Sequence, residues 1–412
     1  MSHGDVLPHH GERSAMGKPH GLRIRWKGVL ALVCALMAAL AAIAPRPAHA
    51  AAGEYQIYPS VHTIGYTGEG WIMRREANVV VEDGIDADIR ACLDEALALK
   101  QITGKDAAAV SGAARQLNVL VGVAGSNGPV DAFARELSAA GRLSYGADLF
   151  TKTDAYLLAS IKGAPDAPDT LLVLGRDTDA FYGLTTLYQI LQQVNGLTIQ
   201  GFTVQDHADV VSRGFIEGYY GNPWSVEDRV NLMTWGGYYK LNAYVYAPKD
   251  DPKHRAHWRE LYTADEVAGE LAPQAEAGNK SKVRFVYALA PFHDEGDARS
   301  PFRFDTEKHY QEDLKVLKAK YLQTIDAGVR QIALLADDSR DWGKIYGSES
   351  TYLRVLNDLT AWIHELQAEQ GEDGGPATRV SKTRSSAARR CGATPAAARP
   401  GTRRCPRTCR WS

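Results

Sequence analysis

Two adjacent carboxylates, Asp337 and Asp338, are the residues of this sequence best suited to proton-transfer chemistry. They follow the apolar run Ile332–Ala336, whose length and composition indicate a short, buried parallel strand. Two neighbouring acids cannot both ionise freely, because each charge raises the energy of the other. Such a pair can supply one carboxylate and one protonated acid at neutral pH. An isolated Asp-Asp pair is more often a turn or a helix cap, and the chain holds another at 250–251.

Strands and helices alternate through the second half of the chain. Helices are predicted from Ser225 to Lys240, from Thr263 onward, over 305–327 and over 349–370. The predicted strands that precede them are Gly214–Glu217, Ala243–Tyr246, Val283–Leu289 and Ile332–Ala336. Four strand-then-helix units predict part of a parallel (β/α)8 barrel over residues 211–370. In such barrels the catalytic side chains lie at the carboxyl ends of the strands, where Asp337 and Asp338 occur.

Residues 51–210 show a different alternation, which predicts a separate α/β accessory domain. Its predicted strands are 55–58, 78–81, 118–123, 156–162 and 170–174, and its predicted helices are 86–99, 130–140 and 177–193. No grouping of catalytic residue types is evident in this part of the sequence. We therefore interpret it as a packing or accessory domain.

The predicted barrel is short. A closed barrel takes roughly 250 residues, whereas residues 212–370 number 159. Residues 371–412 are rich in Arg, Ala, Pro and Gly without apolar periodicity, which we interpret as the product of a shifted reading frame or a truncation. A natural basic tail is the alternative. Because four units leave both sheet edges open, we expect residues 51–412 to be inactive and protease-sensitive after about Val211, unless they dimerise.

The first 50 residues resemble a targeting segment. Basic residues at 23, 25 and 27 precede the apolar run Val29–Ala44, and Ala48-His49-Ala50 has the small-x-small pattern of a cleavage site. We predict a signal peptide cleaved after Ala50, hence a secreted, periplasmic or cell-surface protein without stable membrane insertion. An uncleaved anchor is the alternative, and Met16 is a possible start. Between residues 51 and 370 the only cysteine is Cys92, so no disulfide is expected.

Charge is unevenly distributed along the chain. Residues 1–50 carry +4 and residues 371–412 carry +8, which leaves −14 for residues 51–370 of a chain whose total is −2. An acidic body argues against nucleic acid as a partner. His293 has no second histidine at a spacing that indicates a metal site, so neither a metal nor another cofactor is expected.

Three segments of the chain read RGFIEGYYGNPW (213–224), LNAYVYAPKDDPKHRxxWRELY (241–262) and ALLADD (333–338). They resemble the family 84 glycoside hydrolases, the β-N-acetylglucosaminidases that include protein O-GlcNAcases and hyaluronidase-type enzymes. Each lies on or after a predicted barrel strand, in the order typical of the family. The resemblance covers about 211–366, and the preceding α/β domain also resembles that of secreted bacterial members. The family's remaining pocket residues come from strands five to eight, and nothing after Gln370 matches them.

The resemblance implies retaining hydrolysis in which the substrate's own acetamido oxygen attacks the anomeric carbon. It implies that Asp337 orients the acetamido group and that Asp338 protonates the glycosidic oxygen, then acts as base on water. Gly218 matches a position where backbone approaches a sugar hydroxyl, and Lys249 matches a sugar-contacting lysine. The alternatives are an ordinary turn glycine and a solvated surface lysine.

The expected partners are N-acetylglucosamine-containing glycans or glycoconjugates. One rival is a family 20 hexosaminidase, but those enzymes pair Asp with Glu, unlike Asp337-Asp338. A rival from another class is a non-catalytic carbohydrate-binding or surface-interaction protein on a degenerate barrel, which the retention of both acids, Gly218 and Lys249 disfavours.

Overall fold

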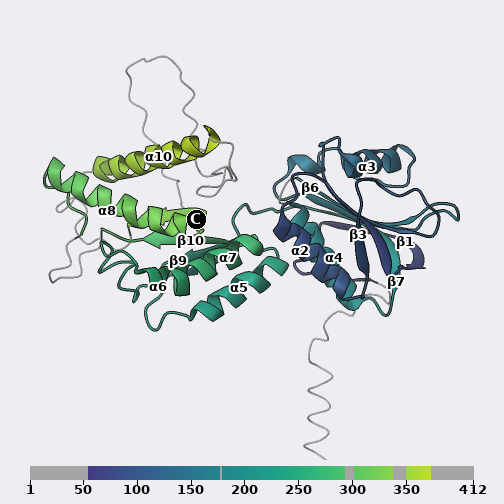
Figure 1. The fold of residues 1–412 in the computed structure, drawn as a ribbon, viewed down its shortest axis with the longest axis horizontal. Coiled ribbons are helices and arrows are strands. Elements are labelled where there is room, and N and C mark those ends of the chain that lie inside the picture. The colour runs from purple at the N-terminus through teal and green to yellow at the C-terminus, as the bar shows by residue number, and fades with distance from the viewer. Residues whose placement is uncertain (1–53, 177–178, 293–300, 337–348, 373–412) are drawn as a thin grey trace, which may run out of the picture. The chain divides into compact units, whose positions relative to one another are not determined.

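The computed structural model describes residues 54–176, 179–292, 301–336 and 349–372. They form two sheets with their helices (Figure 1). The predicted α/β arrangement, with a parallel sheet in the second half, is confirmed. No helix among these residues has the length and apolarity needed to cross a membrane. The apolar run Val29–Ala44 lies outside the described residues.

A mixed seven-stranded sheet with the order β1-β7-β5-β6-β4-β2-β3 organises the first part. Its strands are β1 (Thr63–Ile72), β2 (Glu76–Val81), β3 (Thr103–Asp106), β4 (Leu117–Val123), β5 (Tyr156–Ile161), β6 (Asp169–Gly175) and β7 (Thr198–Asp206). Its helices are α2 (Ala87–Ala98), α3 (Pro129–Ala139), the short η1 (Leu149–Thr151) and α4 (Ala180–Gln193). Strands β3, β2, β4 and β6 run parallel, whereas β5, β7 and β1 pair antiparallel.

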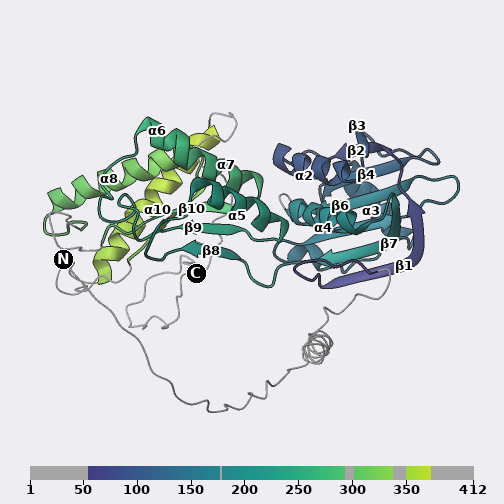
Figure 2. The same cartoon turned by 90° about the horizontal axis from the view of Figure 1, so that it is seen from below.

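Helices cover both faces of this sheet, with α2 and α4 on one face and α3 on the other (Figures 1 and 2). Successive side chains of a strand point to opposite faces, so Val79 packs in the cluster with α2 and α4 while Val80 packs in the cluster with α3. Burial on both sides explains why β4 is apolar almost throughout rather than alternating.

The sequence-based prediction for 55–58 is wrong, because this segment is not a strand. Its amides bond to helix side chains instead of a neighbouring strand: Gln56 N donates to Gln193 Oε1 and Tyr58 N to Gln189 Oε1, both at 2.8 Å. Three strands were not predicted. The edge strand β3 has no buried side chain, β1 is rich in glycine, and the alternation of β7 is broken by two successive buried residues, Gly201 and Phe202.

The second sheet is wholly parallel, in the order β11-β10-β9-β8. Its strands are β8 (Gly214–Glu217), β9 (Ala243–Tyr246), β10 (Arg284–Leu289) and β11 (Gln331–Leu334). Its helices are α5 (Val226–Tyr238), α8 (Glu307–Asp326), α10 (Glu349–Glu372) and a continuous helical run of α6 (Ala264–Glu266), a π-turn (Val267–Leu271) and α7 (Ala272–Lys280). Each strand-then-helix unit predicted from the sequence is present.

Helix starts in this part follow from capping residues. Ser225 accepts a hydrogen bond from the backbone of Asp228 at the start of α5, and Thr263 forms a full capping box with Glu266 at the start of α6. The core lies between the sheet and its helices, with Tyr244 and Tyr287 fully buried. On the face of the sheet opposite these helices, the β8 residue Ile216 is 62% exposed.

Candidate functional site

The loops that follow β8, β9 and β10 lie at the same end of the parallel sheet, which is formed by the carboxyl ends of its strands and is called the carboxyl edge below. Glu217 pairs with Tyr246 at the carboxyl ends of β8 and β9, and the pairing of β10 with β11 runs to Leu289 and Leu334. Leu335 N then donates to Leu289 O at 2.8 Å, which extends this alignment beyond the strand. The described backbone therefore follows β11 to Ala336, the residue before Asp337. Asp337, Asp338 and His293 themselves lie outside the described residues.

Gly218 and Lys249 lie in neighbouring loops at this edge. Ala247 N donates to Glu217 O and Lys249 N donates to Tyr219 O, both at 3.1 Å, so the chain after β9 runs beside the chain after β8. Both residues are half-buried. A Cβ added to Gly218 would meet only Ile216, at 3.4 Å, so the described residues leave room for one. The reason to expect glycine there remains the predicted approach of a ligand.

The two loops are tied together at a tight turn. Gly221 has φ +104°, a left-handed conformation that favours glycine. Its N–H donates to Asp250 Oδ2 at 2.6 Å. Asp251 accepts hydrogen bonds from the Tyr246 hydroxyl, at 2.7 Å, and the Lys253 amide, at 2.8 Å. The second Asp-Asp pair therefore anchors the loops after β8 and β9.

Glu217, which the sequence analysis did not single out, is a fully buried carboxylate at the end of β8. Arg229 on α5 donates to both of its oxygens, at 2.7 and 2.9 Å. The Trp224 amide donates at 2.9 Å, and the Tyr244 hydroxyl also donates to it. Burial opposes ionisation, but these donors outweigh it and lower the pKa of Glu217. This ion pair fixes both ends of the 218–224 loop.

His254 is a second buried polar residue that the sequence analysis missed. Its Nδ1 contacts Ala288 O at 2.8 Å, and its backbone carbonyl accepts from Ala290 N at 3.1 Å. It therefore joins the loop after β9 to the end of β10. Burial lowers the pKa of His254 to about 4, so the ring is neutral and Nδ1 carries the proton donated to Ala288. Its Nε2 has no partner among the described residues.

Lys320 on α8 also holds the loop after β9. Its fully buried Nζ donates to the carbonyl oxygens of Lys253 and Glu260, each at 2.7 Å. Burial lowers the pKa of Lys320 to about 7. No spacing in the sequence connects Lys320 with a loop some 60 residues earlier. Its position on the mostly apolar buried face of α8 was the available signal.

Aromatic rings line the loop after β8. Tyr219, Tyr220 and Trp224 are 37%, 64% and 38% exposed. The Trp224 ring packs 5.7 Å from Tyr219, while Arg255 lies 5.7 Å over the Tyr220 ring. Tyr219 and Trp224 thus pack on each other yet keep exposed area, which leaves both sugar stacking and simple packing as roles.

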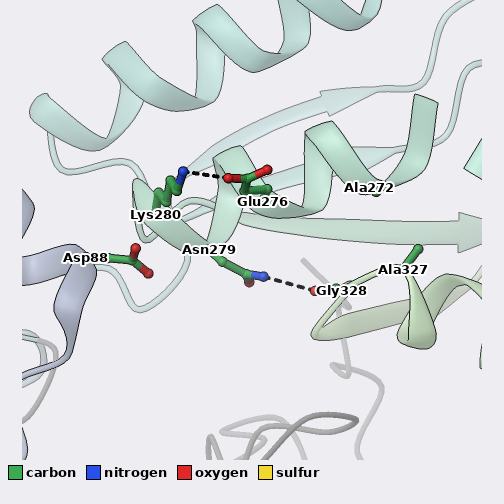
Figure 3. Close-up of a pocket in the computed structure, with 7 residues that line it drawn as sticks. All are labelled: Asp88, Ala272, Glu276, Asn279, Lys280, Ala327 and Gly328. Atoms are coloured by element: carbon green, nitrogen blue, oxygen red, sulfur yellow. Dashed lines mark hydrogen bonds and ion pairs between the residues drawn. The ribbon is translucent and has the colours of Figure 1, made fainter. Parts of the chain in front are cut away.

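A separate hollow of about 320 Å³ lies at the other end of the second sheet (Figure 3). Asn279 and Lys280, which precede β10, and Gly328, which precedes β11, are among its lining residues. The Asn279 side chain donates to Gly328 O at 3.0 Å. Catalytic side chains of parallel barrels lie at the carboxyl ends of strands, so this hollow is not part of the candidate site.

Known proteins are similar to both halves of the chain. Residues 213–373 match the β-N-acetylglucosaminidase family, and residues 54–207 match domain 2 of glycosyl hydrolase family 20. Protein O-GlcNAcase of Rattus norvegicus, like that of Mus musculus, is 38% identical over 125 residues, which are 30% of this chain and 12% of the relative.

Solved structures extend the similarity over most of the chain. The structure of CpGH84D is 33% identical with a TM-score of 0.66, covering 76% of this chain and 49% of that one. The structure of CpGH84B is 25% identical with a TM-score of 0.58, covering 74% of this chain and 47% of that one. The chain thus spans about half the length of these solved relatives. Together these matches support the assignment of the chain as a family 84 glycoside hydrolase.

Proposed function

We propose that this chain carries the acid pair and part of the sugar pocket of a retaining β-N-acetylglucosaminidase. It would release terminal β-linked N-acetylglucosamine from glycans or glycoconjugates. The main support is the common sheet edge reached by Gly218, by Lys249 and by the backbone up to Ala336, directly before the Asp337-Asp338 pair. The similarity to β-N-acetylglucosaminidases over residues 213–373 agrees with this chemistry.

In the proposed mechanism the substrate supplies its own nucleophile. The acetamido oxygen bonds to the anomeric carbon as the glycosidic bond breaks, and the leaving oxygen takes the proton of Asp338. Asp337 accepts the acetamido N–H and stabilises the positive charge that develops as the oxazoline forms. Asp338, now a carboxylate, then removes a proton from the water that opens the oxazoline. Proton transfer by a positioned acid is typically worth about 10²–10⁴-fold in rate.

Gly218 and Lys249 would hold the sugar's hydroxyl groups, one through its backbone and one through its ammonium group. Their loops are joined by the hydrogen bond from Lys249 N to Tyr219 O. A site fixed in this way before the substrate binds favours catalysis, because less ordering remains to be done at the transition state. Export through the predicted signal peptide would place this activity outside the cytoplasm.

The test of the acid assignment compares leaving groups, in a form of the enzyme that carries a complete barrel. Asp338→Asn should slow hydrolysis strongly for glycosides with poor leaving groups, which need the proton. Activated aryl glycosides should be affected much less. Asp265→Asn, an exposed acid in the first turn of α6, serves as the matched control. Equal losses on both substrates would contradict the general-acid role of Asp338.

A second series tests the nucleophile. Fluorines added one at a time to the N-acetyl methyl group make the carbonyl oxygen less nucleophilic. Rates should therefore fall steeply along the series if the acetamido group attacks. A flat series would point to a protein nucleophile and would remove the role proposed for Asp337.

A further inference from the structure

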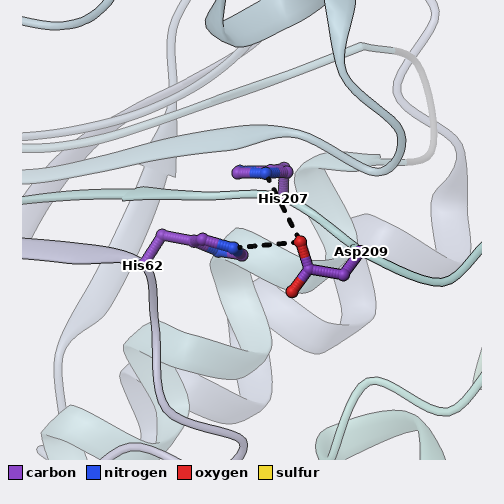
Figure 4. Close-up of side chains that lie close together, drawn as sticks. All are labelled: His62, His207 and Asp209. Carbon is purple, nitrogen blue, oxygen red and sulfur yellow. Dashed lines mark hydrogen bonds and ion pairs between the residues drawn. The ribbon is translucent and has the colours of Figure 1, made fainter.

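A cluster of metal-ligating side chains lies at one end of the β1–β7 strand pair of the first sheet, and none of its residues belongs to the candidate sugar site. The antiparallel register of β1 and β7 pairs Thr63 with Gln205. One residue beyond this pair, His62 is hydrogen-bonded to Asp206, and His62 Nδ1 lies 2.8 Å from Asp206 Oδ1. His207 and Asp209 follow directly in sequence, and Figure 4 shows both histidine rings beside the Asp209 carboxylate. Residues 145 positions apart in the chain are thus brought to one end of the ribbon.

Distances within the cluster suit a small divalent ion. His62 Nε2 lies 3.3 Å from Asp209 Oδ1, and His207 Nε2 lies 3.8 Å from the same oxygen. All three ligand atoms fall within 4.8 Å of one another. Zinc bonds of about 2.0–2.2 Å in tetrahedral geometry place neighbouring ligand atoms about 3.3–3.6 Å apart. Binding therefore requires the ligand atoms to move by a few tenths of an ångström to about one ångström.

The arrangement behind His62 is the one that metal-bound histidines use. A ligating imidazole commonly donates its other N–H to a carboxylate, which fixes the tautomer and the ring orientation. Asp206 takes this position behind His62, which leaves Nε2 facing Asp209. Asp206 is itself held rigidly: it is 4% exposed, and its Oδ2 accepts from Tyr156 and from Lys240, each at 2.9 Å.

We propose that His62, His207 and Asp209 bind a divalent transition-metal ion of the zinc class, with Asp206 as the outer carboxylate. Imidazole nitrogen and carboxylate oxygen are ligands that zinc prefers. Three protein ligands leave one position for water. The ion has access from solvent, because the side chains of His62, His207 and Asp209 are 37%, 19% and 77% exposed.

Ion binding requires one change in the cluster. The two imidazole rings are stacked, with centroids 3.8 Å apart and planes at 21°. Lone pairs of ring nitrogens lie in the ring planes, so stacked rings cannot both point at one ion. His207 is the ring that turns, since His62 is held by Asp206. The bound ion would then join the segment before β1 to the segment after β7, which leads into the second sheet.

The experiment titrates the full chain with zinc, and with cobalt as a spectroscopic substitute. Histidines and cysteines elsewhere in the sequence add background binding, so each variant is compared with the unaltered chain. Asp209→Asn changes an exposed side chain, so the variant is expected to fold normally. His207→Ala removes the ring that must turn. His309→Ala is the matched control, because His309 is a half-buried histidine beside the carboxylate of Asp305.

The expected result is one zinc equivalent that the unaltered chain and His309→Ala bind, and that Asp209→Asn and His207→Ala bind about tenfold or more weakly. At the same zinc concentration, the melting temperature of the first two proteins should rise more than that of the other two. The cobalt spectrum should lose its nitrogen- and oxygen-ligand bands in the same two variants. Equal stoichiometry, affinity and thermal shift in all four proteins would overturn the proposal and leave adventitious binding only.

Discussion

Glu82 connects β2, β4 and α3 through one buried carboxylate that is 5% exposed. Its Oε1 accepts from the amides of Val130 and Asp131, at 2.7 and 2.8 Å. Its Oε2 accepts from the amide of Val123 and the hydroxyl of Ser126, each at 2.8 Å. The N-cap of α3 is a glycine, so Glu82 supplies the acceptor that a capping side chain would otherwise provide.

Glu82→Gln removes the charge and one acceptor from this arrangement. The amide oxygen can still serve the start of α3, and the new NH2 group can donate to Ser126. The Val123 amide is then left buried against another donor. An orphaned buried donor costs about 1–3 kcal/mol, and hydrogen bonds to a charged group are the stronger ones. We expect a total loss of about 2–4 kcal/mol of stability in the first domain.

Hydrogen exchange followed by mass spectrometry measures this loss in the full chain, peptide by peptide. A loss of about 2–4 kcal/mol corresponds to exchange about 30- to 1,000-fold faster in peptides from β4 and α3. Glu136→Gln, an exposed acid on α3, is the control and should leave exchange unchanged. Gly128→Ala should resemble Glu82→Gln, because its Cβ would lie 2.6 Å from Glu82 Oε1. Protection within about threefold of the unaltered chain in Glu82→Gln would refute this reasoning.

Three further predictions concern the second sheet, and each is tested in a form of the enzyme that carries a complete barrel. Glu217→Gln leaves the buried charge of Arg229 unpaired and should cost about 3–5 kcal/mol; adding Arg229→Met should recover part of that loss in a double-mutant cycle of urea unfolding. Lys320→Met removes the ammonium donor from the carbonyl groups of Lys253 and Glu260, so exchange in peptides covering 249–262 should reflect a loss of about 2–4 kcal/mol. His254 has a folded pKa of about 4 against an ordinary value of 6.5, so its protonation favours the unfolded chain: stability is unaffected above pH 6.5 and falls by about 3 kcal/mol as pH drops to 4. His254→Asn keeps the donor to Ala288 and should flatten that acid limb in pH-dependent unfolding, whereas the exposed His364→Asn should not.

Local patterns predicted the second sheet well. Strands β8 and β9 have the residues predicted from short apolar runs, and the caps at Ser225 and Thr263 begin their helices as expected. Such units are specified by neighbours in sequence. The strands missed in the first sheet depend on distant partners instead: β3 lies at a sheet edge with every residue exposed, and β1 pairs with residues of β7 that lie 126 to 142 positions later.

The residues of the candidate site also differ in how far the sequence could predict them. Gly218 and Lys249 are candidates because they lie in segments with a family resemblance, and the structure brings their loops together while their roles stay predictions. Glu217 and His254 occur in the same segments, but their importance comes from burial and from partners that no spacing announces. A glutamate within a short apolar strand was the available signal for Glu217. For His254 the sequence held none.

Several of the hydrogen bonds at the carboxyl ends of the strands in the second sheet join a side chain to the backbone of a loop. Glu217 holds the Trp224 amide, Asp250 the Gly221 amide and Lys320 the carbonyl groups of two residues after β9. Each of these hydrogen bonds fixes main-chain atoms and places no constraint on the identity of the exposed side chains in these loops. A pocket that grips sugar hydroxyls partly through backbone needs that kind of support, because a main-chain atom can be positioned only by the groups around it. Under the proposed function, the buried residues at these strand ends would position the backbone that binds the sugar, and Asp337 and Asp338 would carry the proton transfers.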